Sequence, residues 1–273
     1  MAVKVALVTG ASAGIGEATA LELQRLGYVV YAGARRVDRM AGLRDKGIRT
    51  LALDVTDEES ARQAVATIEA EQGRIDVLVN NAGYGSYGAV EDVTLSEGQR
   101  QFDVNVFGAI RLIQLVTPVM RRQRSGRIIN VSSVGGEIHT PFGAWYHGSK
   151  FALEGMSNVL RIDLAPFGID VVVVQPGSTK SEWSGIAAEH LRETSGRGPY
   201  ARAATNHAKA MTTGPLHDNA SDPSVIAKTI GASVTARRPR TRYVTGYYAR
   251  PVLTLRRVLP ERGFDRIISR SMG

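Results

Sequence analysis

Short apolar runs and longer stretches of helical spacing alternate along the chain from its first residues. The stretch 14–26 carries apolar side chains three and four positions apart and is followed by Gly27, a common residue after a helix. The same spacing predicts helices over 57–72, 97–120 and 146–164, and Asp222-Pro223 begins another. The apolar runs between them predict strands at 3–8, 28–32, 49–53, 75–79, 126–131, 169–174 and 242–245.

Strands separated by helices of this length need crossover connections, which favour a parallel sheet covered on both faces. We therefore predict an α/β fold, a Rossmann-type doubly wound parallel sheet of about seven strands with helices on both faces, in a single domain over 1–273. The segment 182–221 breaks the alternation, because it is rich in Gly, Ser, Thr, Asn and His and has no strand pattern. A segment of this length is commonly a lid over a functional site or a disordered loop.

Positive charge is concentrated near the C-terminus. Ten arginines and two carboxylates fall within 237–273, whereas the other 236 residues hold 24 basic and 24 acidic side chains. The net charge of +8 therefore does not by itself indicate nucleic-acid binding, for which no motif is present. In the extension at about 247–273, basic and apolar residues interleave at near-helical spacing. We favour a helix that packs on the body or on a second subunit over a membrane-surface helix.

The remaining composition narrows the chemistry. The chain has no cysteine, which excludes disulfides and thiolate catalysis. We find no signal-peptide pattern and no window of about 18 or more apolar residues, and therefore expect a cytoplasmic protein. The five histidines lack the paired spacing of a metal site, so we expect no metal. His139 and His147 fall near the candidate site, where surface placement is favoured over a substrate contact.

A glycine-rich turn, T-G-A-S-A-G-I-G at 9–16, joins the first predicted strand to the first helix. Glycines let the backbone approach a pyrophosphate, and the helix N-terminus offers free N–H groups to it. No lysine follows the last glycine, so a P-loop is not indicated. The turn predicts a dinucleotide site at Gly10, Ser12, Gly14, Ile15 and Gly16.

The end of the second predicted strand bears on which dinucleotide binds. It reads Y-A-G-A-R-R at 31–36 and lacks the carboxylate that receives the ribose hydroxyls in NAD-binding versions of this turn. Arg35 and Arg36 stand where a 2′-phosphate would lie, and arginine pairs well with phosphate. The alternative is a solvated basic loop. We predict that the cofactor is NADP(H).

Tyr146 and Lys150 are four residues apart on a predicted helix and therefore share one of its faces. A tyrosine has an ordinary pKa near 10, and a neighbouring ammonium favours its phenolate. Such a pair could serve as a proton donor and acceptor in catalysis. Alone the spacing is common on solvated helices, but it gains meaning beside a dinucleotide turn.

With both motifs present, the chain resembles a short-chain dehydrogenase/reductase of the compact, single-domain type over nearly all of 3–246. The resemblance implies that Asn105 and Ser133 join Tyr146 and Lys150 in catalysis. Ser133 lies 13 residues before Tyr146, the spacing of the catalytic serine, whereas Ser132 does not. The resemblance also adds cofactor contacts to those of the turn and the arginines, at Asp54, Val55, Asn81, Ala82, Gly83, Tyr146, Lys150, Pro176, Gly177, Thr179 and Ser181.

By this resemblance, Tyr146 is the general acid in reduction and the general base in oxidation. Lys150 lowers the pKa of that tyrosine and holds the nicotinamide ribose, and Ser133 binds the substrate oxygen. Asn105 would position a water that links Lys150 to solvent.

Two positions depart from the family pattern. Ser181 stands where a threonine is common and Thr179 lies two residues earlier, which leaves open which hydroxyl contacts the nicotinamide carboxamide. Ala13 stands where some NADP-binding members carry Arg or Lys, so the 2′-phosphate would depend on Arg35 and Arg36.

The expected activity is that of a carbonyl reductase or alcohol dehydrogenase with a moderately bulky, apolar small-molecule substrate. A steroid or retinol and a xenobiotic or secondary-metabolite ketone are equally open. Trp183, Tyr200 and Met211 of the lid either line the pocket or are ordinary packing. The alternatives are a catalytically silent NADP(H)-sensing protein and, less favoured, a sugar-nucleotide epimerase or dehydratase.

The resemblance also implies a homodimer or homotetramer, in which helices around 97–120 and 150–164 pack on their copies. Phe102, Val106, Ile110 and Ile113 fit that interface and also fit packing on the chain's own sheet.

Overall fold

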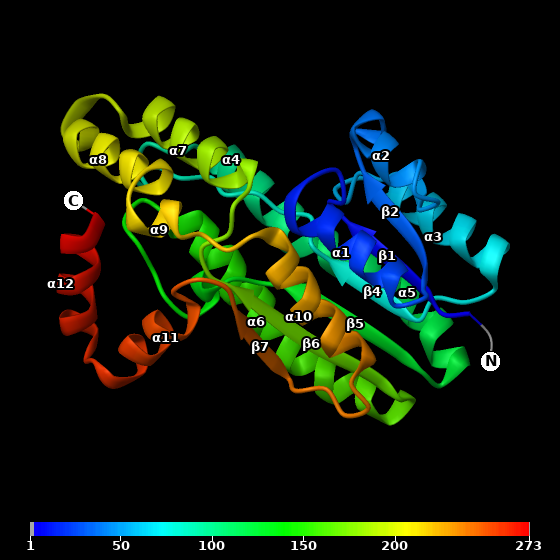
Figure 1. Ribbon diagram of the computed structural model, residues 1–273. Helices are drawn as coiled ribbons and strands as arrows, with labels where there is room; N and C mark the ends of the chain where they lie inside the picture. The colour runs from blue at the N-terminus through cyan, green and yellow to red at the C-terminus, as the bar shows by residue number, and fades with distance from the viewer. Residues whose placement is uncertain (1–2, 273) are drawn as a thin grey trace.

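A seven-stranded parallel sheet forms the centre of the computed structural model, which describes residues 3–272 (Figure 1). The strand order is β3-β2-β1-β4-β5-β6-β7, so the direction of winding reverses between β1 and β4. This confirms the predicted Rossmann-type fold. The strands are β1 Val5–Thr9, β2 Val29–Ala34, β3 Arg49–Ala52, β4 Val77–Asn80, β5 Gly126–Val131, β6 Ile169–Pro176 and β7 Arg242–Thr245.

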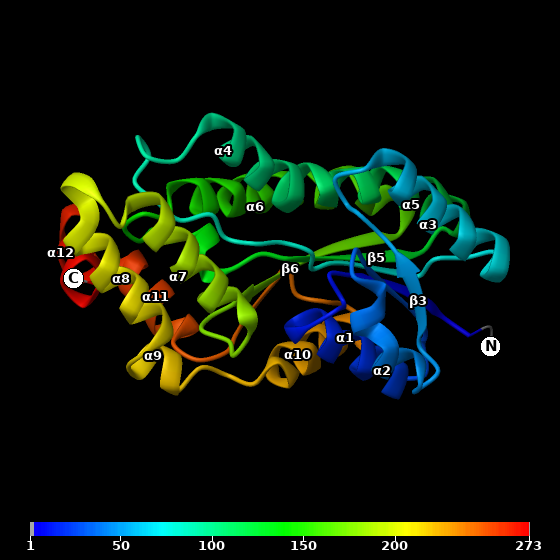
Figure 2. The same cartoon turned by 90° about the horizontal axis from the view of Figure 1, so that it is seen from above.

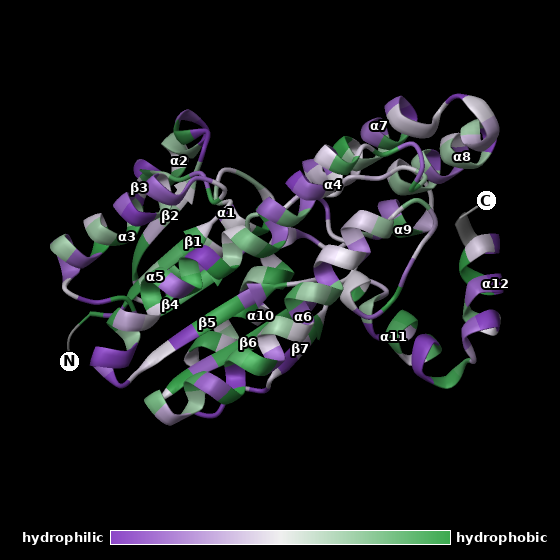
Figure 3. Ribbon diagram, turned by 180° about the vertical axis from the view of Figure 1, so that it is seen from behind, coloured by the Kyte–Doolittle hydropathy of each residue, from purple (hydrophilic) through white to green (hydrophobic). Residues whose placement is uncertain are grey.

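Helices cover both faces of the sheet (Figure 2). The elements α1 (Gly14–Arg25), α2 (Ala41–Arg44) and α10 (Pro223–Thr235) lie on one face. The elements α3 (Glu58–Gln72), α5 (Gly108–Gln123) and α6 (Ala144–Leu164) lie on the other. Successive strand residues point to opposite faces, so Val5 and Leu7 enter one apolar core while Ala6 and Val8 enter the other. This two-sided burial is why the strands read as continuous apolar runs and are mostly hydrophobic in Figure 3.

The predicted helix at 97–120 is divided by a wide turn. It consists of α4 (Leu95–Phe102), a π-helical turn over Asp103–Phe107, and α5. The whole stretch Leu95–Gln123 is long and apolar enough to cross a membrane, which corrects the expectation that no such window exists. However, α5 packs Leu112, Val116 and Met120 onto the sheet, so we interpret the stretch as a core helix of the domain.

The segment 182–221 is helical, so the disordered-loop alternative was wrong. It forms α7 (Glu182–Ser195), α8 (Ala201–Thr212) and the short α9 (Pro215–Asp218). The elements α7 and α8 pack together through small buried side chains, Ala187 and Ala188 on one and Ala204 and Ala208 on the other. Alanine is a good helix former, but in this segment the alanines are mixed with many polar residues, so the helices were not predicted.

The C-terminal extension forms two helices, α11 (Ala249–Val258) and α12 (Glu261–Met272). Val252 and Leu253 of α11 and Phe264 and Ile268 of α12 are buried together with Ile138 of the body. The expected packing on the body is therefore observed. At the level of the ribbon, α12 lies beside α8 (Figures 1 and 2).

Candidate active site

The glycine-rich turn has the backbone shape that a dinucleotide site requires. Gly10 and Gly14 have φ of +65° and +58°, which side chains rarely adopt. A Cβ on Gly16 would lie 2.3 Å from the Gly10 carbonyl oxygen, so the turn closes only with glycine there. The residue before α1, Ala13, makes no side-chain cap, which leaves the first N–H groups of the helix free for an anion.

The loop after β4 holds this turn in place. The Asn81 amide nitrogen donates to the Thr9 carbonyl oxygen at 2.9 Å and to that of Gly10 at 3.3 Å. The Thr9 hydroxyl accepts from the backbone N–H groups of Asn81 and Ala82 at 3.0 and 2.9 Å. The predicted residues 81 and 82 thus lie directly against the turn. Thr9 is the residue that joins the two loops, a role that the sequence motif alone did not reveal.

The adenosine end of the predicted site is basic. Arg35 and Arg36 are exposed where β2 ends. Burial would raise the pKa of Asp54, but hydrogen bonds from Thr56 and the charges of Arg35 and Arg100 outweigh it and hold that pKa below its usual range. Asp54 therefore remains a carboxylate beside these arginines at neutral pH.

The predicted residues around 176–181 form the other wall. The Thr179 hydroxyl donates to the Gly177 carbonyl oxygen at 3.1 Å, whereas Ser181 caps α7 and lies against Gly14 of the turn. Next to Ser181, Glu182 forms an ion pair with Arg39 at 2.9 Å, which connects α7 to the loop that follows Arg36.

These features fit a dinucleotide: an open-backboned turn, a bare helix N-terminus and a basic end without an acidic residue at 31–36. Residues 9–16, 81–83 and 176–181 meet around this turn, Arg35 and Arg36 follow β2, and Asp54 follows β3. Within residues 3–272, the His, Asp and Glu side chains form no cluster of three that could hold a metal ion.

Tyr146 and Ser133 meet at the carboxyl end of the sheet. Tyr146 is in the first turn of α6 and 8% exposed. Ser133 follows β5 and begins a short 3₁₀ turn, in which its hydroxyl accepts from the Gly135 N–H at 3.0 Å. Burial raises the pKa of Tyr146 to about 12, and a hydrogen bond with Ser133 opposes the rise. The phenol is therefore protonated at neutral pH.

Lys150 lies one helical turn beyond Tyr146 and is buried. Its ammonium donates to the Val131 carbonyl oxygen at 3.0 Å. Burial lowers the pKa of Lys150 to about 8, while the Glu154 carboxylate opposes the fall. Ser132, the neighbour of Ser133, turns the other way, toward Gly136 and Glu154, with a buried hydroxyl that has no partner in the described residues.

The π-turn presents Asn105 to this group. Its amide nitrogen donates to the Tyr84 carbonyl oxygen and to the Ser149 hydroxyl, both at 3.0 Å, and its oxygen accepts from the Tyr84 N–H at 3.1 Å. A Cβ on Gly83 would lie 3.1 Å from the Asn105 amide oxygen and 3.8 Å from the Lys150 ammonium. The sequence predicted this residue but not the π-turn, a feature that is frequent at functional sites.

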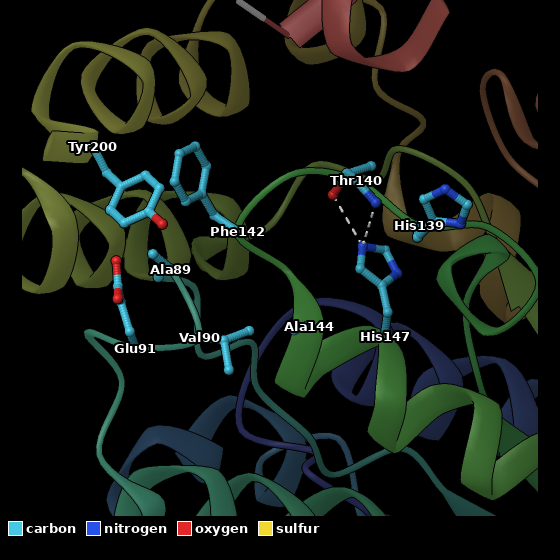
Figure 4. Close-up of a pocket in the computed structure, with 10 residues that line it drawn as sticks. Ala89, Val90, Glu91, His139, Thr140, Phe142, Ala144, His147 and Tyr200 are labelled. Atoms are coloured by element: carbon cyan, nitrogen blue, oxygen red, sulfur yellow. Dashed lines mark hydrogen bonds between the residues drawn. The ribbon is translucent and has the colours of Figure 1, made fainter. Parts of the chain in front are cut away.

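A pocket of about 610 Å³ opens at the first turn of α6, where Ala144 and His147 line it (Figure 4). Its aromatic wall includes Phe142 and Tyr200, whose rings meet edge to face at 6.1 Å. Phe142 adopts φ of +63°, which is strained for a bulky residue. The pocket is lined by Gly88, Ala89, Val90, Glu91, His139, Thr140, Phe142, Ala144, His147 and Tyr200.

His147 corrects the expectation of surface placement, because it is buried and lines this pocket. Its Nε2 accepts from the Thr140 N–H at 3.0 Å, so Nδ1 carries the proton and donates to the Gly135 carbonyl oxygen at 2.9 Å. Burial lowers the pKa of His147 to about 4. The imidazole is thus a neutral, fixed part of the wall. His139 also lines the pocket but is exposed.

Residues of the segment 182–221 cluster over Tyr146. The Trp183 ring centroid is 5.0 Å from that of Tyr146 and 6.0 Å from that of Tyr87. Met211 packs on the same cluster. Tyr87, which sequence reasoning missed, is its centre and also contacts Tyr146 at 5.8 Å.

Comparison with known proteins identifies the family. Residues 4–191 match the sequence profile described as short chain dehydrogenase. The chain belongs to the short-chain dehydrogenase/reductase family. It is 33% identical to the probable short-chain type dehydrogenase/reductase VdlC of Helicobacter pylori over 96% of both chains. It is also 45% identical to 3-ketodihydrosphingosine reductase of Bacteroides thetaiotaomicron, over 64% of this chain and 63% of that protein.

Solved structures agree with this assignment. A short-chain dehydrogenase from Streptomyces avermitilis superimposes with a TM-score of 0.83 at 32% identity, over 100% of this chain and 99% of that one. A metagenomic short-chain oxidoreductase in complex with NADP has a TM-score of 0.70 at 26% identity, over 89% and 96%. This short-chain dehydrogenase/reductase is therefore an oxidoreductase of a family that uses nicotinamide cofactors.

Proposed function

We propose that this short-chain dehydrogenase/reductase interconverts a ketone or aldehyde and an alcohol with NADP(H) as cofactor. The observation that carries the proposal is the meeting of Ser133, Tyr146 and Lys150 beside an aromatic pocket and the dinucleotide turn. The exposed Arg35 and Arg36, with no carboxylate at 31–36, support NADP(H) over NAD(H). The metagenomic relative in complex with NADP gives further support.

When bound, the nicotinamide supplies or accepts the hydride. In reduction, the Tyr146 phenol gives its proton to the carbonyl oxygen while the carbonyl carbon receives the hydride, so an alcohol forms. The Ser133 hydroxyl holds the same oxygen and stabilises its developing charge. The Lys150 ammonium favours the resulting phenolate, and Asn105 connects this end of the site to the loop after β4.

The pocket supports a moderately bulky, apolar substrate. Phe142 and Tyr200 supply apolar ring surface, and Trp183 and Tyr87 continue it to Tyr146. The relative named 3-ketodihydrosphingosine reductase acts, by its name, on a keto compound with a long apolar portion. We therefore place a sphingoid ketone beside steroids, retinal and aryl ketones as candidate substrates.

The test is the initial rate of NADPH and NADH oxidation against a panel that runs from small aldehydes to these bulky carbonyls. We expect faster turnover with NADPH and, in Tyr146→Phe, a loss of roughly 10²- to 10⁴-fold, the usual contribution of a general acid. Full activity in Tyr146→Phe would contradict the mechanism. Clear NADPH binding without turnover across the panel would instead favour a cofactor-sensing protein, against which the intact catalytic set argues.

We also propose that the protein is a homo-oligomer, cytoplasmic, in which α6 packs on its copy. Of the residues expected at this interface, Ile113 and Ile110 pack in the core against the chain's own sheet, and Val106 is buried. The exposed apolar face of α6 is formed instead by Phe151, Val159 and Ile162.

A further inference from the structure

The outer face of α12 carries a stripe of arginines. Arg262, Arg266 and Arg270 are spaced four residues apart and exposed, on the side of the helix opposite the buried Phe264 and Ile268. Figure 3 shows the hydrophilic and hydrophobic residues interleaved along α12. Packing on the body therefore accounts for the inner face of this helix and leaves the arginine stripe unexplained.

The carboxylates of the hairpin formed by α11 and α12 do not neutralise the stripe. Glu261 pairs with Arg256 at 3.3 Å, and Asp265 pairs with His139 at 2.8 Å. Among the described residues, the three stripe arginines form no ion pair with a carboxylate. This face is consequently positive and open to an anionic partner.

The same hairpin carries two exposed aliphatic side chains. Val258, at the end of α11, is 69% exposed, and Ile267 of α12 is 42% exposed beside the stripe. Val258 points away from the body, because Val252 and Leu253 occupy the inner side of α11. Exposed basic residues attract anionic lipid, and exposed aliphatic residues beside them add apolar area that can be buried at a lipid–water interface.

The hairpin also adjoins the mouth of the pocket. His139 lines the pocket, and its ring lies 5.4 Å from that of Phe264 and bonds Asp265. The arginine stripe is thus one helix thickness from the pocket rim. A surface on which this face rested would lie next to the entrance.

We propose that the outer face of the C-terminal hairpin docks on the surface of an anionic lipid bilayer. The stripe arginines contact lipid phosphates, and Val258 and Ile267 enter the headgroup region. The exposed aliphatic groups beside the arginines favour a bilayer over an acidic protein, because such groups can enter the headgroup region of a bilayer. The inference does not depend on the reaction, but it places the pocket entrance where apolar carbonyl compounds dissolve.

The test is co-sedimentation of the full chain with vesicles of phosphatidylglycerol and phosphatidylcholine, or of phosphatidylcholine alone. We expect binding to the anionic vesicles that weakens as the salt concentration rises. The triple variant R262Q/R266Q/R270Q should bind on the order of a hundredfold more weakly, given the contribution of each basic residue at such a surface. The double variant V258S/I267S should weaken the binding that remains at high salt.

The matched control is R237Q/R238Q/R240Q, which removes the same charge from an exposed loop at the other end of β7. We expect it to bind nearly as well as the unchanged protein. Equal losses in the two triple variants, or no sedimentation with anionic vesicles, would overturn the proposal. Unchanged circular dichroism and melting temperature in each variant establish that the comparison is made between folded proteins.

Discussion

The ammonium of Lys150 is buried, and burial disfavours its charged form. The nearest compensation on its own helix is Glu154, a buried carboxylate one turn further along α6. Glu154 accepts from the Gln175 side chain at 2.9 Å and from Arg242 at 3.0 Å, so its position is fixed. We infer that Glu154 is a positioning residue, which acts on catalysis through Lys150 and does not touch substrate.

Replacement of Glu154 by Gln should move the pH profile of carbonyl reduction. The proposed mechanism requires charged Lys150, so kcat should fall as the pH rises through the pKa of this lysine, about 8. Loss of the carboxylate lowers that pKa, and the falling limb should shift to lower pH by about half a unit to one unit. The measurement is kcat against pH with saturating NADPH.

Glu137→Gln provides the matched control, since Glu137 accepts from the same Gln175 at 2.7 Å but is not a cause of the Lys150 pKa shift. An equal shift in both variants would show that the effect is not specific to Glu154.

At the scale of elements, the exposed side of α6 is the clearest unpaired apolar surface. Phe151, Val159 and Ile162 are 47%, 58% and 70% exposed at helical spacing, and Phe107 of the neighbouring π-turn is 52% exposed. Gly155, between them, leaves open space where a partner helix could approach closely. Such a stripe suits a two-fold contact, in which the same face meets its copy.

Val159→Glu together with Ile162→Glu should reduce the mass of the assembly, because both changes bury unpaired charge in that contact. Size-exclusion chromatography with light scattering measures this directly. Val90→Glu changes another exposed aliphatic residue, 63% exposed and on a different surface, and should leave the mass unaltered. A monomeric unchanged protein would refute the contact.

The sequence predicted most elements, because their burial leaves a local signature. Strands such as β6 are buried on both faces and therefore appear as unbroken apolar runs. The turn at 9–16 and the Tyr146–Lys150 spacing likewise depend on neighbours in the chain, and the structure brings these residues together. Their catalytic and cofactor-binding roles stay predictions.

What the sequence did not reveal depends on distant contacts. The π-turn is fixed by the bonds of Asn105 to Tyr84 and Ser149, from two other elements. His147 is buried because Gly143 and Gly135 leave room for its ring: a Cβ on Gly143 would lie 2.5 Å from it. Neither of these contacts produces a periodic pattern in the sequence from which it could be predicted.

At the scale of the whole molecule, two buried neutral histidines in the aromatic cluster make the folding stability depend on pH. His147 and His207 are 6% and 2% exposed, and burial lowers the pKa of each to about 4. In the unfolded chain both would titrate near 6.5, so the unfolded state binds protons that the folded state does not. The contribution of these two neutral histidines to folding stability is therefore fully present above about pH 6.5 and declines as the pH falls toward 4.

Each histidine should lower the free energy of unfolding by at most about 1.4 kcal/mol per pH unit in this range. In urea titrations between pH 6.5 and 4.5, His207→Gln should show a shallower pH dependence than the unchanged protein. His217→Gln changes an exposed histidine and should show the same pH dependence as the unchanged protein. An unaltered slope in His207→Gln would mean that this histidine is already protonated in the folded state.

The π-turn at Asp103–Phe107 holds one residue more than an α-helical turn would, and its wider winding absorbs that residue locally. The element α4 therefore keeps nearly the phase that an uninterrupted α-helix would give it. Deleting one residue from the first turn of α5 would instead rotate α4 by about 100° about its axis. The rotation would carry away Gln101, which accepts from the Ser86 N–H at 2.6 Å and donates to the Tyr84 carbonyl oxygen at 2.7 Å. The π-turn is thus the place where this helix can gain or lose a single residue without detaching the loop that forms one wall of the pocket.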